Sequence, residues 1–140
     1  TKIKDLTIWG INNVYDLCVI ASKTLDGEIN AKEKKYTTAI AFLQEAVHKE
    51  DALNYDEPPD WFFSVRHHLG AVLLDAGHYK TAVKVYEEDL KNFPKNGWAL
   101  RGLMNAYEKL GDKKKFEETK SRFELAWRYA DFKINSSRIL

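Results

Sequence analysis

Apolar residues recur along most of the chain at intervals of three and four positions, which is the spacing of an amphipathic α-helix. Six such stripes can be traced, and they run over residues 11–29, 36–47, 61–76, 79–90, 100–110 and 116–130. Val19 and Ile20 widen the first stripe, so we expect its helix to be buried on more than one side. No segment of four to eight residues alternates cleanly between apolar and polar, and the sequence therefore predicts no strand.

Turn-forming residues lie where the stripes end. Gly77 and Gly111 can adopt a positive φ and are expected to end the third and fifth helices. Pro94 separates the fourth helix from the fifth. The segment Pro58-Pro59-Asp60 stops the chain before the third helix, and Asp60 is expected to be its N-cap. The short connections predict antiparallel neighbouring helices, arranged as hairpins over about 8–52, 60–93 and 97–130 with a tail at 131–140.

Part of this pattern is repeated at a fixed interval. Three residues of one stretch recur 34 positions later, Leu69 as Leu103, Leu73 as Tyr107 and Gly77 as Gly111 (69 to 103, 73 to 107, 77 to 111). A weaker copy precedes them by 43 positions and pairs Gly27 with Gly70, Tyr36 with Tyr79, Ala39 with Ala82, Leu43 with Tyr86 and Ala46 with Asp89. The longer interval implies an insertion near residues 54–62, and its role is left open.

These residues resemble the tetratricopeptide repeat, a helix–turn–helix unit of 34 residues that stacks on copies of itself. The best copy carries Leu69-Gly70, Leu73, Gly77, Tyr79, Ala82, Tyr86 and Pro94 at the family's positions. The insertion resembles that of uncharacterised bacterial members of the superfamily. The resemblance implies an all-α fold, a single-domain α-solenoid of about three hairpins over residues 1–140. The second helix of the third hairpin departs from the pattern, so we expect a modified C-terminal helix that packs as a terminal cap.

Composition and charge narrow the class of protein. With 140 residues, 44% hydrophobic and 31% charged, the chain is expected to fold as one globular domain. The net charge of +1 gives no electrostatic reason to expect nucleic acid as a partner, and no stretch is apolar for long enough to insert into a membrane. The first residue is Thr1, which fits a mature form or an excised fragment, so the compartment stays open, with the cytoplasm slightly favoured.

Reactive residues are few. The single cysteine, Cys18, lies in an apolar run and is expected to be a small buried thiol. His67 and His68 are adjacent on a helix and point about 100° apart, so they cannot readily chelate one metal. We expect no catalytic site, no metal site and no cofactor, because no nucleophile–base set or ligand motif is present.

One set of residues favours a binding surface. Trp98, Arg101 and Asn105 share a face of one helix, and an Arg and an Asn four positions apart can together hold a carboxylate. Some tetratricopeptide domains clamp the carboxylate of a peptide in a similar way, and the resemblance places this face on the concave side of the solenoid. The corresponding positions are Thr24 and Glu28 in the first copy and His67 and Ala71 in the second, so the complete clamp is missing.

The sequence thus predicts a non-catalytic scaffold that binds a protein or peptide on its concave face. The candidate residues are Glu28, His67, Ala71, Trp98, Arg101 and Asn105. A first alternative is structural, in which the chain is a segment of a larger solenoid or a homo-oligomer. A second alternative is a metal- or substrate-binding protein that uses His67 and His68.

Overall fold

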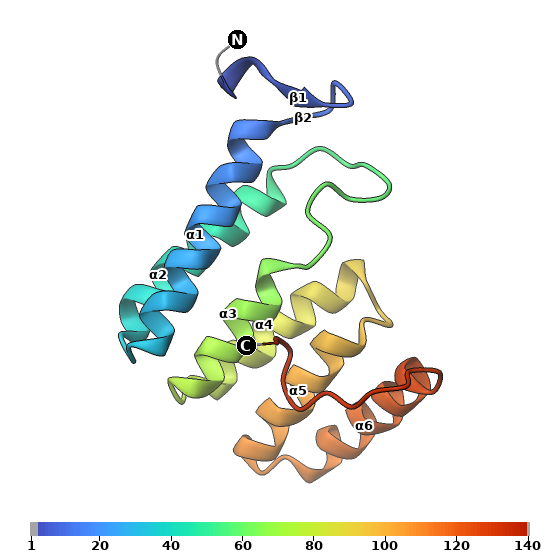
Figure 1. Cartoon of the computed structure of the whole chain (residues 1–140). Coiled ribbons are helices and arrows are strands. Elements are labelled where there is room, and N and C mark those ends of the chain that lie inside the picture. The colour runs from blue at the N-terminus through green and yellow to red at the C-terminus, as the bar shows by residue number, and fades with distance from the viewer. Residues whose placement is uncertain (1–2, 140) are drawn as a thin grey trace. The chain divides into compact units, whose positions relative to one another are not determined.

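The computed structural model describes residues 3–139, and helices dominate this part of the chain (Figure 1). Its α-helices are α1 Val14–Lys32, α2 Tyr36–Asp51, α3 Val65–Asp75, α4 Tyr79–Asn92, α5 Gly97–Leu110 and α6 Lys113–Trp127. A short 3-10 helix, η1 Ile3–Asp5, and two strands, β1 Thr7–Ile8 and β2 Asn12–Asn13, precede them. The prediction of a mostly helical chain with six packed helices is confirmed over the described residues.

The helices are divided between two compact units. One unit ends at Val65 and contains β1, β2, α1 and α2, and the other begins at Arg66 and contains nearly all of α3 together with α4, α5 and α6. Helices that follow one another in the sequence pack against each other in both units, as the antiparallel pair α1 and α2 illustrates (Figure 1).

In the first unit, α1 and α2 approach closely at a glycine. A Cβ atom added to Gly27 would collide with the side chain of Leu43, which is fully buried. Asn13 begins α1 because its side-chain Oδ1 accepts a hydrogen bond from the Tyr15 backbone N–H at 2.7 Å.

The prediction that α1 is buried on more than one side is wrong. Leu25 is 61% exposed and Ile29 is 48% exposed, whereas Leu17 and Ile20 are buried. Within the first unit, α2 approaches α1 on the side that contains Gly27, and Leu25 and Ile29 lie on another side of the helix. Cys18 lies on the uncovered side and is exposed, so the expectation of a buried thiol is also wrong.

The prediction of no strand is wrong at the N-terminal end. Thr7 pairs with Asn13 and Ile8 with Asn12 in an antiparallel hairpin. Its turn contains Trp9 and Gly10, both with a positive φ (50° and 76°). Strands of two residues are too short to show the alternation on which the sequence prediction depended. The turn conformation and a few hydrogen bonds hold them instead.

Asn12 fastens this hairpin to the insertion after α2. Its side-chain Nδ2 donates to the backbone oxygen of Asn54 at 3.0 Å and to the Asp60 carboxylate at 2.9 Å, and its Oδ1 accepts from the Asn54 N–H at 2.8 Å. The expectation that Asp60 is the N-cap of the third helix is therefore wrong, because α3 begins only at Val65. The carboxylate binds the hairpin, not a helix end.

In the second unit, a tyrosine fills the space between two helices. The ring of Tyr86 is fully buried, and a Cβ atom added to either Gly70 on α3 or Gly102 on α5 would collide with it. Glycine is required at both positions because the ring occupies the volume of a side chain. As predicted, Gly77 and Gly111 adopt positive φ values, 79° and 72°, where α3 and α5 end.

Aromatic rings join α5, α6 and the segment that follows α6. The Trp98 ring packs edge-on against Trp127 at a centroid distance of 5.7 Å, and Phe132 lies 5.4 Å from Trp127. The Trp127 indole N–H donates to the Phe132 backbone oxygen at 2.8 Å. This cluster turns the chain back at the end of α6 and starts the path of the C-terminal segment.

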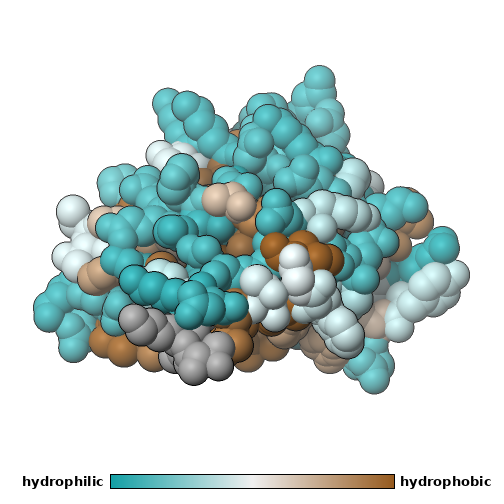
Figure 2. All heavy atoms as spheres, turned by 90° about the horizontal axis from the view of Figure 1, so that it is seen from above, coloured by the Kyte–Doolittle hydropathy of each residue, from teal (hydrophilic) through white to brown (hydrophobic). Residues whose placement is uncertain are grey.

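No helix in the part of the chain that the structure describes combines the length and the apolar character that crossing a membrane requires. Figure 2 shows one face of the molecule, on which hydrophilic side chains predominate and hydrophobic ones reach the surface in limited areas.

Candidate functional site

The residues after α6 lie on the second unit itself. We call residues 132–139 the tail, and the surface that it covers on α3 and α5 the α3–α5 face. The tail contains no helix or strand, and it runs from the end of α6 past α5 towards α3 (Figure 1). Contacts at Asn105 on α5 and at the His67 backbone on α3 fix this path.

The predicted carboxylate-binding residues lie on this face, and the tail uses one of them. Asn105 donates its side-chain N–H to the backbone oxygen of Asn135 at 2.9 Å. The Arg101 guanidinium lies over the Phe123 ring, with 5.7 Å from its Cζ atom to the ring centroid. Its Nε atom is buried, and no described residue offers that atom a hydrogen bond. The structure thus brings Trp98, Arg101 and Asn105 together, half-buried, and leaves Arg101 without a carboxylate partner among the described residues.

The other three predicted residues are less accessible. His67 is 2% exposed, and Ala71 beside it on α3 is also buried. Glu28 is buried in α1, in the first unit, and is engaged in an interaction of its own. These three side chains are buried, so the accessible polar groups of the α3–α5 face come mainly from α5.

A buried polar network explains why His67 is covered. Its Nε2 atom lies 3.2 Å from the Asp89 carboxylate and 3.1 Å from the Asn96 side-chain nitrogen. The Asn96 Oδ1 accepts from the backbone N–H groups of Trp98 and Ala99 at the start of α5, which assigns Nδ2 as the group near the imidazole. Because the Asp89 carboxylate can only accept, we assign the Nε2 proton to His67, which donates it to Asp89, and the Asn96 Nδ2 also donates to Asp89 at 3.4 Å. The network joins α3, α4 and the N-terminus of α5.

Ser137 reaches the same region from the tail but contacts different atoms. Its hydroxyl donates to the backbone oxygen of His67 at 2.8 Å and pairs with the Tyr86 phenol at 2.7 Å. Burial raises the pKa of the Tyr86 phenol well above its usual value near 10, although the hydrogen bond with Ser137 lowers it in part. The phenol therefore remains protonated at neutral pH.

A serine, a histidine and an aspartate gather here, yet they do not form a nucleophilic triad. Such a triad needs the serine hydroxyl on the imidazole ring and open to substrate. Ser137 is 1% exposed, and its hydroxyl bonds to the His67 backbone instead of the ring. These groups can hold the tail and the helices together, but this geometry activates no nucleophile.

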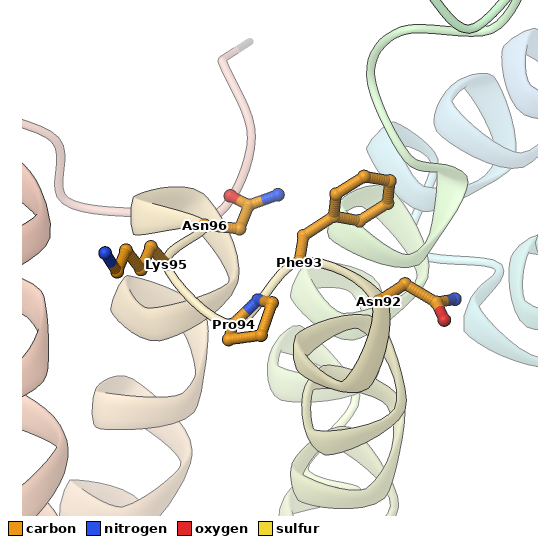
Figure 3. A pocket seen from close by; sticks show the side chains of 5 residues that line it. All are labelled: Asn92, Phe93, Pro94, Lys95 and Asn96. Carbon is orange, nitrogen blue, oxygen red and sulfur yellow. The ribbon is translucent and has the colours of Figure 1, made fainter. Parts of the chain in front are cut away.

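A shallow hollow lies at the connection between α4 and α5, with a volume of about 510 Å³. Asn92, Phe93, Pro94, Lys95 and Asn96 line it, and Figure 3 shows their side chains pointing to different sides of the loop. The Asn96 amide is already engaged with His67 and Asp89. The remaining groups do not converge on one point, so the hollow offers no arrangement for a reaction.

The metal-binding alternative requires at least three ligating side chains that lie close enough together to hold one ion. Among residues 3–139, no three His, Cys, Asp or Glu side chains are placed to hold one ion. His67 is engaged with Asp89, and His68 is engaged in an interaction of its own.

Sequence reasoning found the α5 residues of this face but not the groups that meet them from the tail. Ser137 and the backbone oxygen of Asn135 carry no sequence signal, because one polar residue in a short tail fits solvent equally well. Phe132 and Ile134 do carry a sequence signal, because apolar residues after the last helix are expected to pack against another part of the protein.

Comparison with known proteins adds no assignment: no family model matches this chain, and no curated protein matches it.

Proposed function

We propose that the chain is a non-catalytic, protein- or peptide-binding module of the tetratricopeptide kind, in which the α3–α5 face takes a non-helical segment of a partner. The observation that supports this proposal is the tail, which already lies on that face as a bound peptide would. Asn105 holds it by a backbone oxygen, a contact that any peptide sequence can make. The 34-residue repeat and the six sequentially packed helices fit the same proposal.

Arg101 and Trp98 supply the means to prefer some segments over others. An aromatic ring and an arginine are frequent energetic anchors of binding surfaces. The Arg101 side chain is half-buried and has no carboxylate partner among residues 3–139, so an acidic group of a partner that reaches its guanidinium would gain a charge-assisted hydrogen bond.

A display library of capped nine-residue peptides, selected against the full chain, tests the proposal. Binding of the selected peptides should weaken about tenfold or more in Arg101→Ala, because a hydrogen bond to a charged group contributes about 1.5–3 kcal/mol. Asn105→Ala should also weaken binding. Asn92→Ala, an exposed change in the hollow at the α4–α5 connection, is the matched control and should leave binding unchanged.

Two results would contradict the proposal. One is a set of selected peptides whose affinity falls in Asn92→Ala and stays the same in Arg101→Ala and Asn105→Ala. The other is a selection that enriches no peptide, with the wild-type chain and with a variant in which the tail is released.

A structural role as a self-associating segment is the second candidate, and the uncovered stripe of α1 favours it. Leu25 and Ile29 are large apolar residues exposed on one helix face, together with Tyr15. If two copies pair through this stripe, light scattering should give the mass of a dimer, and Leu25→Glu should restore the monomer. A monomer at high concentration in the wild-type chain would contradict this candidate.

A further inference from the structure

Successive residues of the tail make different contacts with the helices of the second unit. Ile134 is buried, the Asn135 backbone accepts from Asn105, and Ser137 is buried against Tyr86. Arg138 then forms an ion pair with Asp75 at 2.8 Å, and its side chain is only 9% exposed. Lys133 and Ile139 lie outside this set and are exposed. The surface therefore contacts an apolar side chain, a hydroxyl three positions later and a guanidinium directly after it.

The position that receives the hydroxyl is narrow and chemically defined. The Tyr86 ring lies between Gly70 and Gly102, and its phenol oxygen meets the tail together with the backbone oxygen of His67. A serine satisfies both groups with one small side chain. Alanine would leave both polar groups without their partner, and a larger residue would collide with the ring or the helix backbone.

The tail leaves one charge of the face unused. Phe132 contacts Trp98, and Asn135 contacts Asn105, so the residues between them pass the turn of α5 that carries Arg101. In this chain Lys133 stands in that stretch, where it offers no carboxylate to the guanidinium. A segment with an acidic residue there would have charge complementarity that the tail lacks.

We propose that the α3–α5 face selects a partner segment of the form acidic–apolar–x–x–Ser–Arg, and that the chain's own Lys133–Arg138 is an imperfect internal copy that competes with it. This inference rests on the proposed function, because it names the ligand chemistry of the same face. The internal copy closes the site until a better match, with the acid that Lys133 lacks, displaces it.

The test uses the full chain with the tail released. Ile134→Asp places a charge in a buried position and should detach the tail. The probe is a fluorescent, capped peptide with the sequence of residues 131–139. It should bind Ile134→Asp at least about tenfold more tightly than it binds the wild-type chain, where the tail competes. Circular dichroism checks the fold, and Ser137→Glu gives a second release variant at the other end of the tail.

Matched peptides test the pattern itself. The change Lys133→Glu in the peptide should tighten binding, and this gain should vanish in a chain that also carries Arg101→Ala. The change Ser137→Ala should weaken binding about tenfold. Ser136→Ala, at the neighbouring half-buried position, removes a long hydrogen bond (3.4 Å) from the Arg138 backbone N–H and is the control, with a much smaller expected effect.

The outcomes separate the two proposals. Folded release variants that bind library peptides but not the tail peptide would overturn this inference and leave the proposed function standing. Release variants that bind neither kind of peptide would overturn both. Equal binding of the tail peptide by wild-type and release variants would overturn the competition, and equal affinities for the Ser137→Ala and Ser136→Ala peptides would overturn the selection of serine.

Discussion

The phenol oxygen of Tyr86 on α4 lies 2.7 Å from the hydroxyl oxygen of Ser137, 51 residues further along the chain. The tyrosine ring is buried between two glycines, so its only polar atom emerges at the surface that the tail covers. One residue thus fills the helix core and fixes the tail. The stability of the second unit and the occupation of its α3–α5 face are therefore coupled through a single side chain.

Ser137→Ala should lower the free energy of unfolding by about 1–3 kcal/mol. The change removes two buried hydrogen bonds and leaves the Tyr86 phenol and the His67 backbone oxygen without that partner. Urea denaturation followed by circular dichroism measures the difference. Ser136→Ala is the control, and equal stabilities for the two variants would contradict the tail position.

Gly70→Ala and Gly102→Ala should each destabilise the second unit by overpacking the Tyr86 ring, at a cost of about 1–3 kcal/mol. The better helix propensity of alanine offsets up to about 1 kcal/mol of this cost. The double variant should lose more than the two single losses combined, because the ring can move away from one added methyl group only towards the other. Strict additivity in urea denaturation would argue against the shared contact.

The helices could be predicted because each stripe is long enough to show its period, and because Gly77 and Gly111 occur where a left-handed residue is required. The exposed side of α1 could not be predicted in the same way. Apolar spacing shows that Leu25 and Ile29 share a face, but it does not show whether any element covers that face. Residues Leu17 and Ile20, which do contact the core, belong to a neighbouring stripe of the same helix.

The α3–α5 face could also be predicted only in part from the sequence. Helical spacing alone placed Trp98, Arg101 and Asn105 on one side of α5, because that relation is local. The partner of Asn105 is a backbone oxygen 30 residues away, and any residue at position 135 would provide the same atom. Contacts to the backbone leave no trace in the sequence, so the tail's position required the structure.

Asn12→Ala should loosen the connection between the N-terminal hairpin and the segment after α2. Asn12 is buried and links to Asn54 and Asp60 by three hydrogen bonds, so we expect a loss of about 1–3 kcal/mol. Hydrogen exchange at the Asn54 amide should become faster. Asn92→Ala, at an exposed position, should change stability by no more than about 0.5 kcal/mol. An unchanged exchange rate at Asn54 would contradict the link.

Cys18 should react with a thiol reagent in the folded protein at a rate similar to that in urea. The side chain is exposed on the uncovered side of α1, so the reagent needs no local unfolding to reach it. Absorbance of the released thiolate measures the rate directly. Strong protection at low protein concentration would mean that this side is covered, and protection that appears only at high concentration would favour self-association through α1.

Stability should fall as the pH rises above about 10, and Tyr86 should cause part of the fall. Burial raises the pKa of the Tyr86 phenol, and burial followed by the hydrogen bond to Glu87 raises that of Tyr107. Both residues lose their protons near pH 10 when the chain is unfolded. Above that pH the unfolded state binds fewer protons than the folded state, so the free energy of unfolding decreases with pH.

Urea denaturation between pH 8 and about pH 11 should show a weaker decrease in Tyr86→Phe than in the wild-type chain. All other ionisable groups are the same in both proteins, so the difference between the two slopes isolates Tyr86. Identical slopes would mean that its phenol is open to solvent, which the contact with Ser137 does not allow.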